Sequence, residues 1–160
     1  MSAITRLEPV EWERYRALRL RSLSEDPDAF WNTFEEEEGL KEEEWRKRLS
    51  ENPTYVAVLG GEDVGAATGC PHYDRDGAAA LVGMWVAPLA RGTGLACALI
   101  EEVIVWAREE GFPHLFLDVA DENAAAIKLY ERMGFAPTGV KNHMPPPRDH
   151  ISEHERALEL

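Results

Sequence analysis

The sequence predicts a single α/β domain over residues 1–160, built on a mixed sheet of about seven strands with helices on both faces. Hydrophobic residues make up 44% of the 160-residue chain, which is enough for one compact core. Three consecutive strand-like segments favour an antiparallel part of the sheet, and a strand–helix–strand unit over residues 78–119 favours a parallel pair. The expected order of elements is β-α-α-β-β-β-α-β-α-β-β.

The first part of the chain is expected to form one strand and two helices. Residues 4–7 alternate as a strand does, and Pro9 suits the first turn of a helix. Trp12, Tyr15 and Leu18 continue that helix as an apolar stripe, and Pro27 interrupts it. Residues 40–49 have the pattern of a second amphipathic helix.

The rest of the chain alternates between strand and helix signals. Gly60 and Gly61 mark a tight turn between two strands, and Gly111 and Gly134 mark the ends of two helices. Residues 141–150 are rich in proline and are expected to form a loop. Strands are predicted at 54–59, 64–70, 78–86, 114–119, from 135 and at 153–160, and helices at 95–110 and 123–133.

Composition excludes several classes of protein. The net charge of −13 argues against a non-specific nucleic-acid binder, and it favours cationic ligands such as amines, although it also serves solubility. No apolar stretch approaches the length of a membrane span, so we expect a cytoplasmic protein without membrane contact. Cys70 and Cys97 do not form a disulfide framework, and the histidines match no metal site.

A glycine-containing turn stands between a buried strand and a helix. Pro88 ends the strand, and Gly92 and Gly94 allow close approach to the backbone. Unpaired amides and the positive end of the helix dipole together predict an anion site suited to a diphosphate, to which Arg91 adds positive charge. No lysine follows Gly94 as a nucleoside-triphosphate loop requires, and the glycine spacing is not that of a dinucleotide fold.

This turn resembles a known signature. Residues 91–96, Arg-Gly-Thr-Gly-Leu-Ala, are similar to the Q/R-x-x-G-x-G/A motif of the GNAT N-acetyltransferase superfamily. The resemblance implies that backbone groups of the preceding strand hold the pantetheine arm of acetyl-CoA, while the turn holds its pyrophosphate. The other interpretation is a plain turn with glycines for packing. The implied cofactor-binding residues are Met84, Trp85 and Val86 on the strand, and Arg91, Gly92, Thr93, Gly94, Leu95, Ala96 and Cys97 on the turn.

A second motif strengthens the resemblance. Residues 123–135 follow an N-x-x-A-x-x-L-Y-E-x-x-G-F pattern, with a local likeness to the ribosomal-protein alanine acetyltransferase group. By resemblance, Tyr130 gives a proton to the departing sulfur and Asn123 contacts the cofactor arm. Core packing with Ile127 and Met133 is the alternative for Tyr130, and a helix N-cap is the alternative for Asn123.

Asp118 is the candidate general base. An ammonium with a pKa of about 10.4 must lose a proton before it can attack a thioester. Asp118 lies in an apolar strand where burial would raise its pKa, and it aligns with the base of the alanine-acetylating group. Its side chain is one methylene shorter than glutamate, which favours a water relay. The alternative is a strand-end aspartate that caps the next helix.

The family builds its acceptor site largely from the first helices and the loop before the last strand. Aromatic side chains among many carboxylates suit a cationic amine, although most charge runs are solvated faces. The substrate-binding candidates are Trp31, Phe34, Glu35 and His143.

The function predicted from the resemblance is transfer of an acetyl group from acetyl-CoA to a primary amine by direct attack. A catalytically silent acyl-CoA-binding sensor or scaffold is the alternative. Paired chains are common in this family, so a homodimer is compatible with the sequence.

Overall fold

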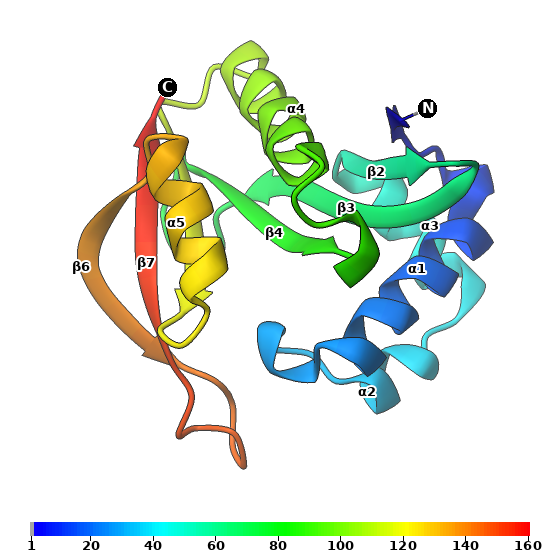
Figure 1. The fold of residues 1–160 in the computed structure, drawn as a ribbon, viewed down its shortest axis with the longest axis horizontal. Helices are drawn as coiled ribbons and strands as arrows, with labels where there is room; N and C mark the ends of the chain where they lie inside the picture. The colour runs from blue at the N-terminus through cyan, green and yellow to red at the C-terminus, as the bar shows by residue number, and fades with distance from the viewer. Residues whose placement is uncertain (1) are drawn as a thin grey trace.

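The computed structural model describes residues 2–160, which form one seven-stranded sheet with helices on both faces (Figure 1). The strand order across the sheet is β1-β2-β3-β4-β5-β7-β6. The strands are β1 Ser2–Arg6, β2 Thr54–Leu59, β3 Glu62–Pro71, β4 Ala79–Val86, β5 His114–Ala120, β6 Ala136–His143 and β7 Ser152–Glu159. The helices are α1 Trp12–Glu25, α2 Phe34–Glu38, α3 Glu42–Glu51, α4 Leu95–Glu109 and α5 Ala124–Arg132, with short 3-10 turns at Pro9–Glu11, Pro27–Ala29 and Pro88–Ala90.

The predicted mixed sheet is confirmed, with two differences in detail. The short helix α2 is additional, and it begins where the Thr33 hydroxyl accepts a hydrogen bond from the Glu36 amide. Strand β6 continues to His143 in a segment expected to be a loop, because Lys141 and Asn142 pair with β7 before the first of the prolines. Local sequence did not predict that pairing, since the partner strand lies on the far side of the loop.

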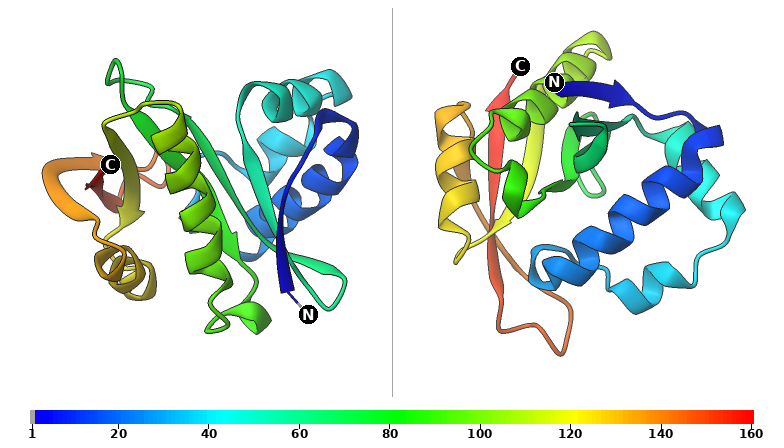
Figure 2. Two further views of the ribbon diagram at one scale, coloured as in Figure 1. Left: turned by 90° about the horizontal axis from the view of Figure 1, so that it is seen from above. Right: turned by 45° about the vertical axis from the view of Figure 1, so that its right-hand side comes forward.

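The helices form two layers around the sheet, as the views of Figure 2 show. Helix α4 packs on β3 and β4 on one face, and the α1–α3 group covers the other face of the N-terminal half of the sheet. The largest fully buried side chain, Trp45 of α3, meets Tyr15 of α1 edge-on with ring centroids 5.7 Å apart. No helix within residues 2–160 has the length and apolar character needed to cross a bilayer.

Strands β4 and β5 are joined at two positions and then separate. The parallel register pairs Ala79 with Leu115 and Ala80 with Phe116, and it ends there. The register between β3 and β4 shifts near Gly83, whose φ of 61° belongs to the left-handed region that favours glycine. Such a bulge increases local twist, and this one lies where β4 leaves β5. The separation leaves the facing edges of both strands open to a ligand.

A buried ion cluster connects the three N-terminal helices. Glu37 is 1% exposed and receives hydrogen bonds from Arg19 of α1, at 3.0 Å through Nε and Nη2, and from Arg48 of α3 at 2.8 Å. The Asn32 amide donates a further bond at 3.0 Å. Burial acts to raise the pKa of Glu37, but the Arg19 and Arg48 guanidinium groups outweigh it and lower the pKa to about 2. The carboxylate is therefore a structural anion that fixes α1, α2 and α3 together.

Replacing Glu37 with Gln is expected to reduce the free energy of unfolding by about 3 kcal/mol at pH 7, since a pKa lowered from 4.5 to about 2 corresponds to that amount. A carboxylate whose pKa is lower in the folded protein contributes its full stabilisation at any pH above its pKa in the unfolded chain. That contribution is lost as the pH falls toward about 2, the pKa in the folded protein. The difference between wild type and Glu37→Gln should therefore shrink from pH 5 to pH 3 in urea unfolding. The exposed Glu38→Gln is the matched control, and a pH-independent difference would contradict this account.

Candidate functional site

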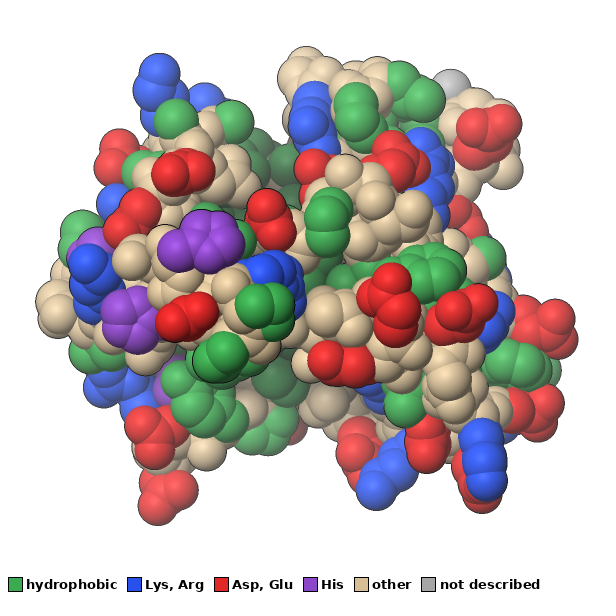
Figure 3. Space-filling view, turned by 90° about the horizontal axis from the view of Figure 1, so that it is seen from below, with side chains coloured by type: hydrophobic (Ala, Val, Ile, Leu, Met, Phe, Trp, Pro, Cys, Tyr) green, Lys and Arg blue, Asp and Glu red, His purple; other side chains and the backbone are tan. Residues whose placement is uncertain are grey.

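The separated strands form the wall of a large cleft with a volume of about 1580 Å³. Residues 80–86 of β4 and 116–120 of β5 line it, together with the start of α4 and one side of α5. The segments 25–32 and 150–153 complete its far end. The space-filling view of Figure 3 shows a hollow between the two halves of the surface, with acidic side chains on both sides of it.

The turn before α4 presents free backbone amides. Within residues 2–160, no hydrogen bond is made by the amides of six consecutive residues, 92–97, and the first helical bond runs from Ala98 to the Gly94 carbonyl at 3.1 Å. Gly92 and Gly94 have φ values of 80° and 86°, and a Cβ atom at either would meet nothing within 4 Å. Open amides at a helix N-terminus are suited to a phosphate group.

Arg91 is fixed beside this turn by two contacts. Its Nε donates to the Val86 carbonyl at 3.0 Å, and its Nη2 donates to Asp26 at 3.1 Å. The indole of Trp85 donates to the same Asp26 oxygen at 2.6 Å. Arg91 therefore also anchors the end of α1 to β4, and its positive charge is shared with a carboxylate that the sequence did not identify.

The other cofactor candidates fall into two groups. Met84, Trp85 and Val86 lie on the β4 wall, and Gly92, Gly94, Ala96 and Cys97 line the cleft at the start of α4. Thr93 and Leu95 do not line it: the Thr93 hydroxyl donates to the Ala90 carbonyl, and the Leu95 side chain is buried in the core. Any contact from these two residues would come from their backbone amides.

Helix α5 brings Asn123 and Tyr130 to the cleft. The Asn123 side-chain oxygen accepts the Ala126 amide at 3.2 Å, so this residue caps the helix and lines the cleft at once. Tyr130 is 7% exposed and packs edge-on against Phe135 at 5.7 Å. Burial raises the pKa of Tyr130 well above its ordinary value, so its hydroxyl is protonated at neutral pH.

Asp118 lies on the free part of β5, two residues beyond the last pair with β4. It is half-buried, and its closest polar partner is the Asn142 amide at 3.4 Å. Burial raises the pKa of Asp118, and the charge of Glu155, its partner in register on β7, also raises it. The hydrogen bond from Asn142 lowers this pKa but does not outweigh the other effects. A carboxylate with a raised pKa is better matched to accepting a proton near neutral pH.

Comparison with known proteins identifies the family. The family model described as Acetyltransferase (GNAT) family matches residues 12–135, which is well over half of the chain. The chain belongs to this family. A solved structure of a ribosomal-protein-alanine N-acetyltransferase from Brucella melitensis shares the fold, with a TM-score of 0.81 and 24% identity over 99% of both chains.

Two further relatives of this GNAT chain are informative. The structure of yncA from Salmonella typhimurium, with its cofactor acetyl-CoA, has a TM-score of 0.82 with 18% identity over 100% of this chain and 94% of that chain. The streptothricin acetyltransferase of Streptomyces lavendulae is 34% identical over 57% of this chain and 48% of its own length. This chain thus matches about half the length of that relative.

The acceptor candidates of the GNAT chain are not all brought together. Trp31 lines the cleft, and its indole donates a hydrogen bond to Glu153. Phe34 and Glu35 line a smaller hollow of about 370 Å³ next to it, and His143 lies exposed at the end of β6, away from the cleft wall. Strand β6 continues through His143, so the loop begins only after this residue. His150, at the other end of that loop, lines the cleft instead.

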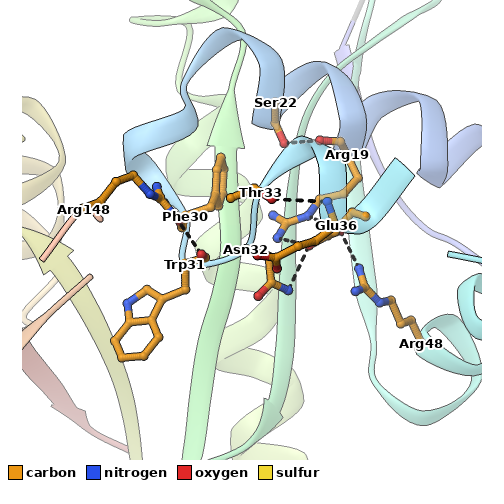
Figure 4. Close-up of polar contacts among 10 residues, drawn as sticks. Arg19, Ser22, Phe30, Trp31, Asn32, Thr33, Glu36, Arg48 and Arg148 are labelled. Atoms are coloured by element: carbon orange, nitrogen blue, oxygen red, sulfur yellow. Dashed lines mark hydrogen bonds and ion pairs between the residues drawn. The ribbon is translucent and has the colours of Figure 1, made fainter. Parts of the chain in front are cut away.

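Sequence reasoning missed several residues at this end of the cleft. Glu153 and Glu155 are 3% and 4% exposed on β7, where they alternate with His154 and Arg156. That alternation shows which residues share a face, but it does not show which face is covered. Arg148 was also missed. It donates to the carbonyls of Pro27 at 2.7 Å and Phe30 at 2.9 Å, and to the carbonyl of Trp31 at 2.7 Å, beside which Figure 4 shows it.

The free amides of the turn give a first test of the site. Gly94→Ala forces a residue with a side chain into positive φ at the helix start, so the dissociation constant for CoA in calorimetry should rise about tenfold or more. Gly61→Ala is the matched control, since Gly61 has a φ of 82° and equally open surroundings in the β2–β3 turn. Equal loss of CoA affinity in both variants would show that the turn is not the binding site.

Proposed function

We propose that this chain is an N-acetyltransferase that moves an acetyl group from acetyl-CoA to a primary, cationic amine. The row of six free amides at residues 92–97 carries the proposal, because it opens onto the same cleft as a protonated phenol and a carboxylate of raised pKa. Acetyl-CoA supplies the thioester. The residues of this chain would bind the diphosphate at the turn, orient the arm along β4 and move two protons.

The proposed steps assign one proton to each of two side chains. Asp118 accepts the proton of the acceptor ammonium, directly or through a water, so that the neutral nitrogen can bond to the carbonyl carbon. As the carbon–sulfur bond breaks, the Tyr130 hydroxyl donates its proton to the leaving sulfur. The attacking nitrogen loses its second proton through water as the amide forms, and that proton restores the Tyr130 hydroxyl. Free backbone N–H groups on the open edges of the strands are suited to stabilise the negative charge on the carbonyl oxygen.

The charge of the cleft supports a cationic acceptor. Asp118, Glu153 and the terminal residues of α1 place carboxylates along the cleft, and Trp31 adds an aromatic face. Carboxylates and an indole together suit an ammonium group. The acidic net charge of the chain would also attract such an acceptor over longer distances.

The test of this function is turnover with acetyl-CoA and a library of amines, measured as release of free thiol. Tyr130→Phe should lower kcat by about a hundredfold while CoA affinity in calorimetry is retained, because the change removes one proton donor. Tyr15→Phe, in the core against Trp45, is the control for a lost hydroxyl. Thiol release that is unaffected by Tyr130→Phe would contradict its role, and CoA binding without any turnover would leave the sensor function.

The pH dependence of kcat/KM tests Asp118 separately. A base must be deprotonated, so activity should fall as pH decreases through a pKa that lies above the ordinary 3.8. Asp118→Asn should lower kcat/KM about a hundredfold and remove that acidic limb. The exposed Asp76→Asn should keep the profile of the wild type. A limb that persists unchanged in Asp118→Asn would assign the proton transfer to another group.

A further inference from the structure

Three carboxylates share one face of β5 and β7, near the end of the cleft that is formed by residues 25–32 and 150–153. Asp118 pairs in register with Glu155, and Ala120 pairs with Glu153, so Asp118 and Glu153 are diagonal neighbours on this face. Glu155 forms an ion pair with Arg75 at 2.5 Å, lies 3.5 Å from the His72 ring, and accepts a further hydrogen bond from Thr138 at 2.7 Å. Within residues 2–160, neither Asp118 nor Glu153 has a cationic partner.

Glu153 is the less expected of the two. It is 3% exposed, it lines the cleft, and one of its oxygens accepts the Trp31 indole, whereas the other makes no hydrogen bond within the described chain. Arg148 lies close enough to influence it, but the Nη1 and Nη2 groups of Arg148 donate to the backbone carbonyls of residues 27, 30 and 31. A buried carboxylate without a cation is unfavourable, and a cation in the cleft would relieve that penalty.

Trp31 supplies the second part of a cation site. Its side chain is 46% exposed on the cleft wall, and Figure 4 shows the indole pointing away from the Arg19 and Arg48 side chains. Two of the carbonyls that Arg148 holds belong to Phe30 and Trp31, so this segment is fixed in place. An aromatic ring hydrogen-bonded to a carboxylate gives a cation both a π face and a counter-charge.

We propose that Glu153 and Trp31 bind a second positive charge of the acceptor, which makes short aliphatic diamines the preferred substrate class. The inference rests on the proposed function, in which Asp118 takes the proton from the reacting ammonium. One ammonium cannot serve both carboxylates, because the reacting nitrogen loses its charge before attack. Diagonal neighbours on a sheet are about 7–8 Å apart at their Cα atoms, a spacing that a short diamine can bridge.

The experiment compares propylamine with 1,3-diaminopropane, which differ by the second amine. In the wild type, kcat/KM for thiol release should be at least about tenfold higher for the diamine, as expected for one charge-assisted contact. In Glu153→Gln, kcat/KM for the diamine should fall about tenfold more than that for propylamine. For each amine, kcat/KM of the wild type is divided by kcat/KM of the variant, so the intrinsic reactivity of that amine cancels.

Glu159→Gln, at the exposed end of the same strand, is the matched control and should keep the diamine preference. CoA affinity in calorimetry shows that each variant is folded, and Trp31→Leu gives a second measurement of the ratio if Glu153→Gln does not fold. Turnover of propylamine without any diamine preference, or a preference that survives both changes, overturns this inference and leaves the proposed function standing. Absence of thiol release with every amine overturns both.

Discussion

The separation of β4 from β5 is the constraint on which the rest of the site depends. The two parallel strands are joined at Ala79–Leu115 and Ala80–Phe116 and then diverge, with a bulge at Gly83 where β4 turns away. A continuous sheet would pair these edges and fill the space with side chains. Because it does not, the N-terminus of α4, one side of α5 and the free part of β5 all open onto one cleft.

Side-chain contacts stabilise this open arrangement. Asp26 receives hydrogen bonds from Trp85 and Arg91, which joins the end of α1 to the wall and to the turn. The buried Glu37 cluster fixes α1, α2 and α3 as a unit. Across the separation, the hydrogen bonds of Arg148 to the carbonyls of residues 27, 30 and 31, and of the Trp31 indole to Glu153, connect the two halves of the molecule.

The residues that the sequence assigns to the cofactor lie together on one cleft because this part of the cleft is built from local motifs. Gly92 and Gly94, the strand before them and the Asn123–Tyr130 helix are short motifs whose chemistry follows from their spacing, and all but Thr93 and Leu95 of the predicted side chains line the cleft. The mixed sheet followed from the order of the strand and helix signals. These features need little information about which distant segments meet.

The acceptor end could not be predicted in the same way. Glu153 lines the cleft because of the register of β7 against β5, and His143 lies away from the cleft because β6 pairs with β7 through residue 143. Phe34 and Glu35 belong to a helix whose start depends on the Thr33 cap, and they face a neighbouring hollow. Strand register and helix placement are long-range properties, and an acidic residue in an alternating strand has the same pattern whether it is buried or exposed.

The contacts of Arg148 have a consequence for how new specificities can arise on this scaffold. Its guanidinium links a loop near the C-terminus to carbonyls that are between 117 and 121 positions earlier in the chain. The wall that would meet the amine is therefore shared by two remote stretches of sequence, whereas the cofactor end occupies one stretch in the middle. Grafting either loop alone from another member of the family would break the bridge, so both would have to be exchanged together, and the central stretch could be left as it is.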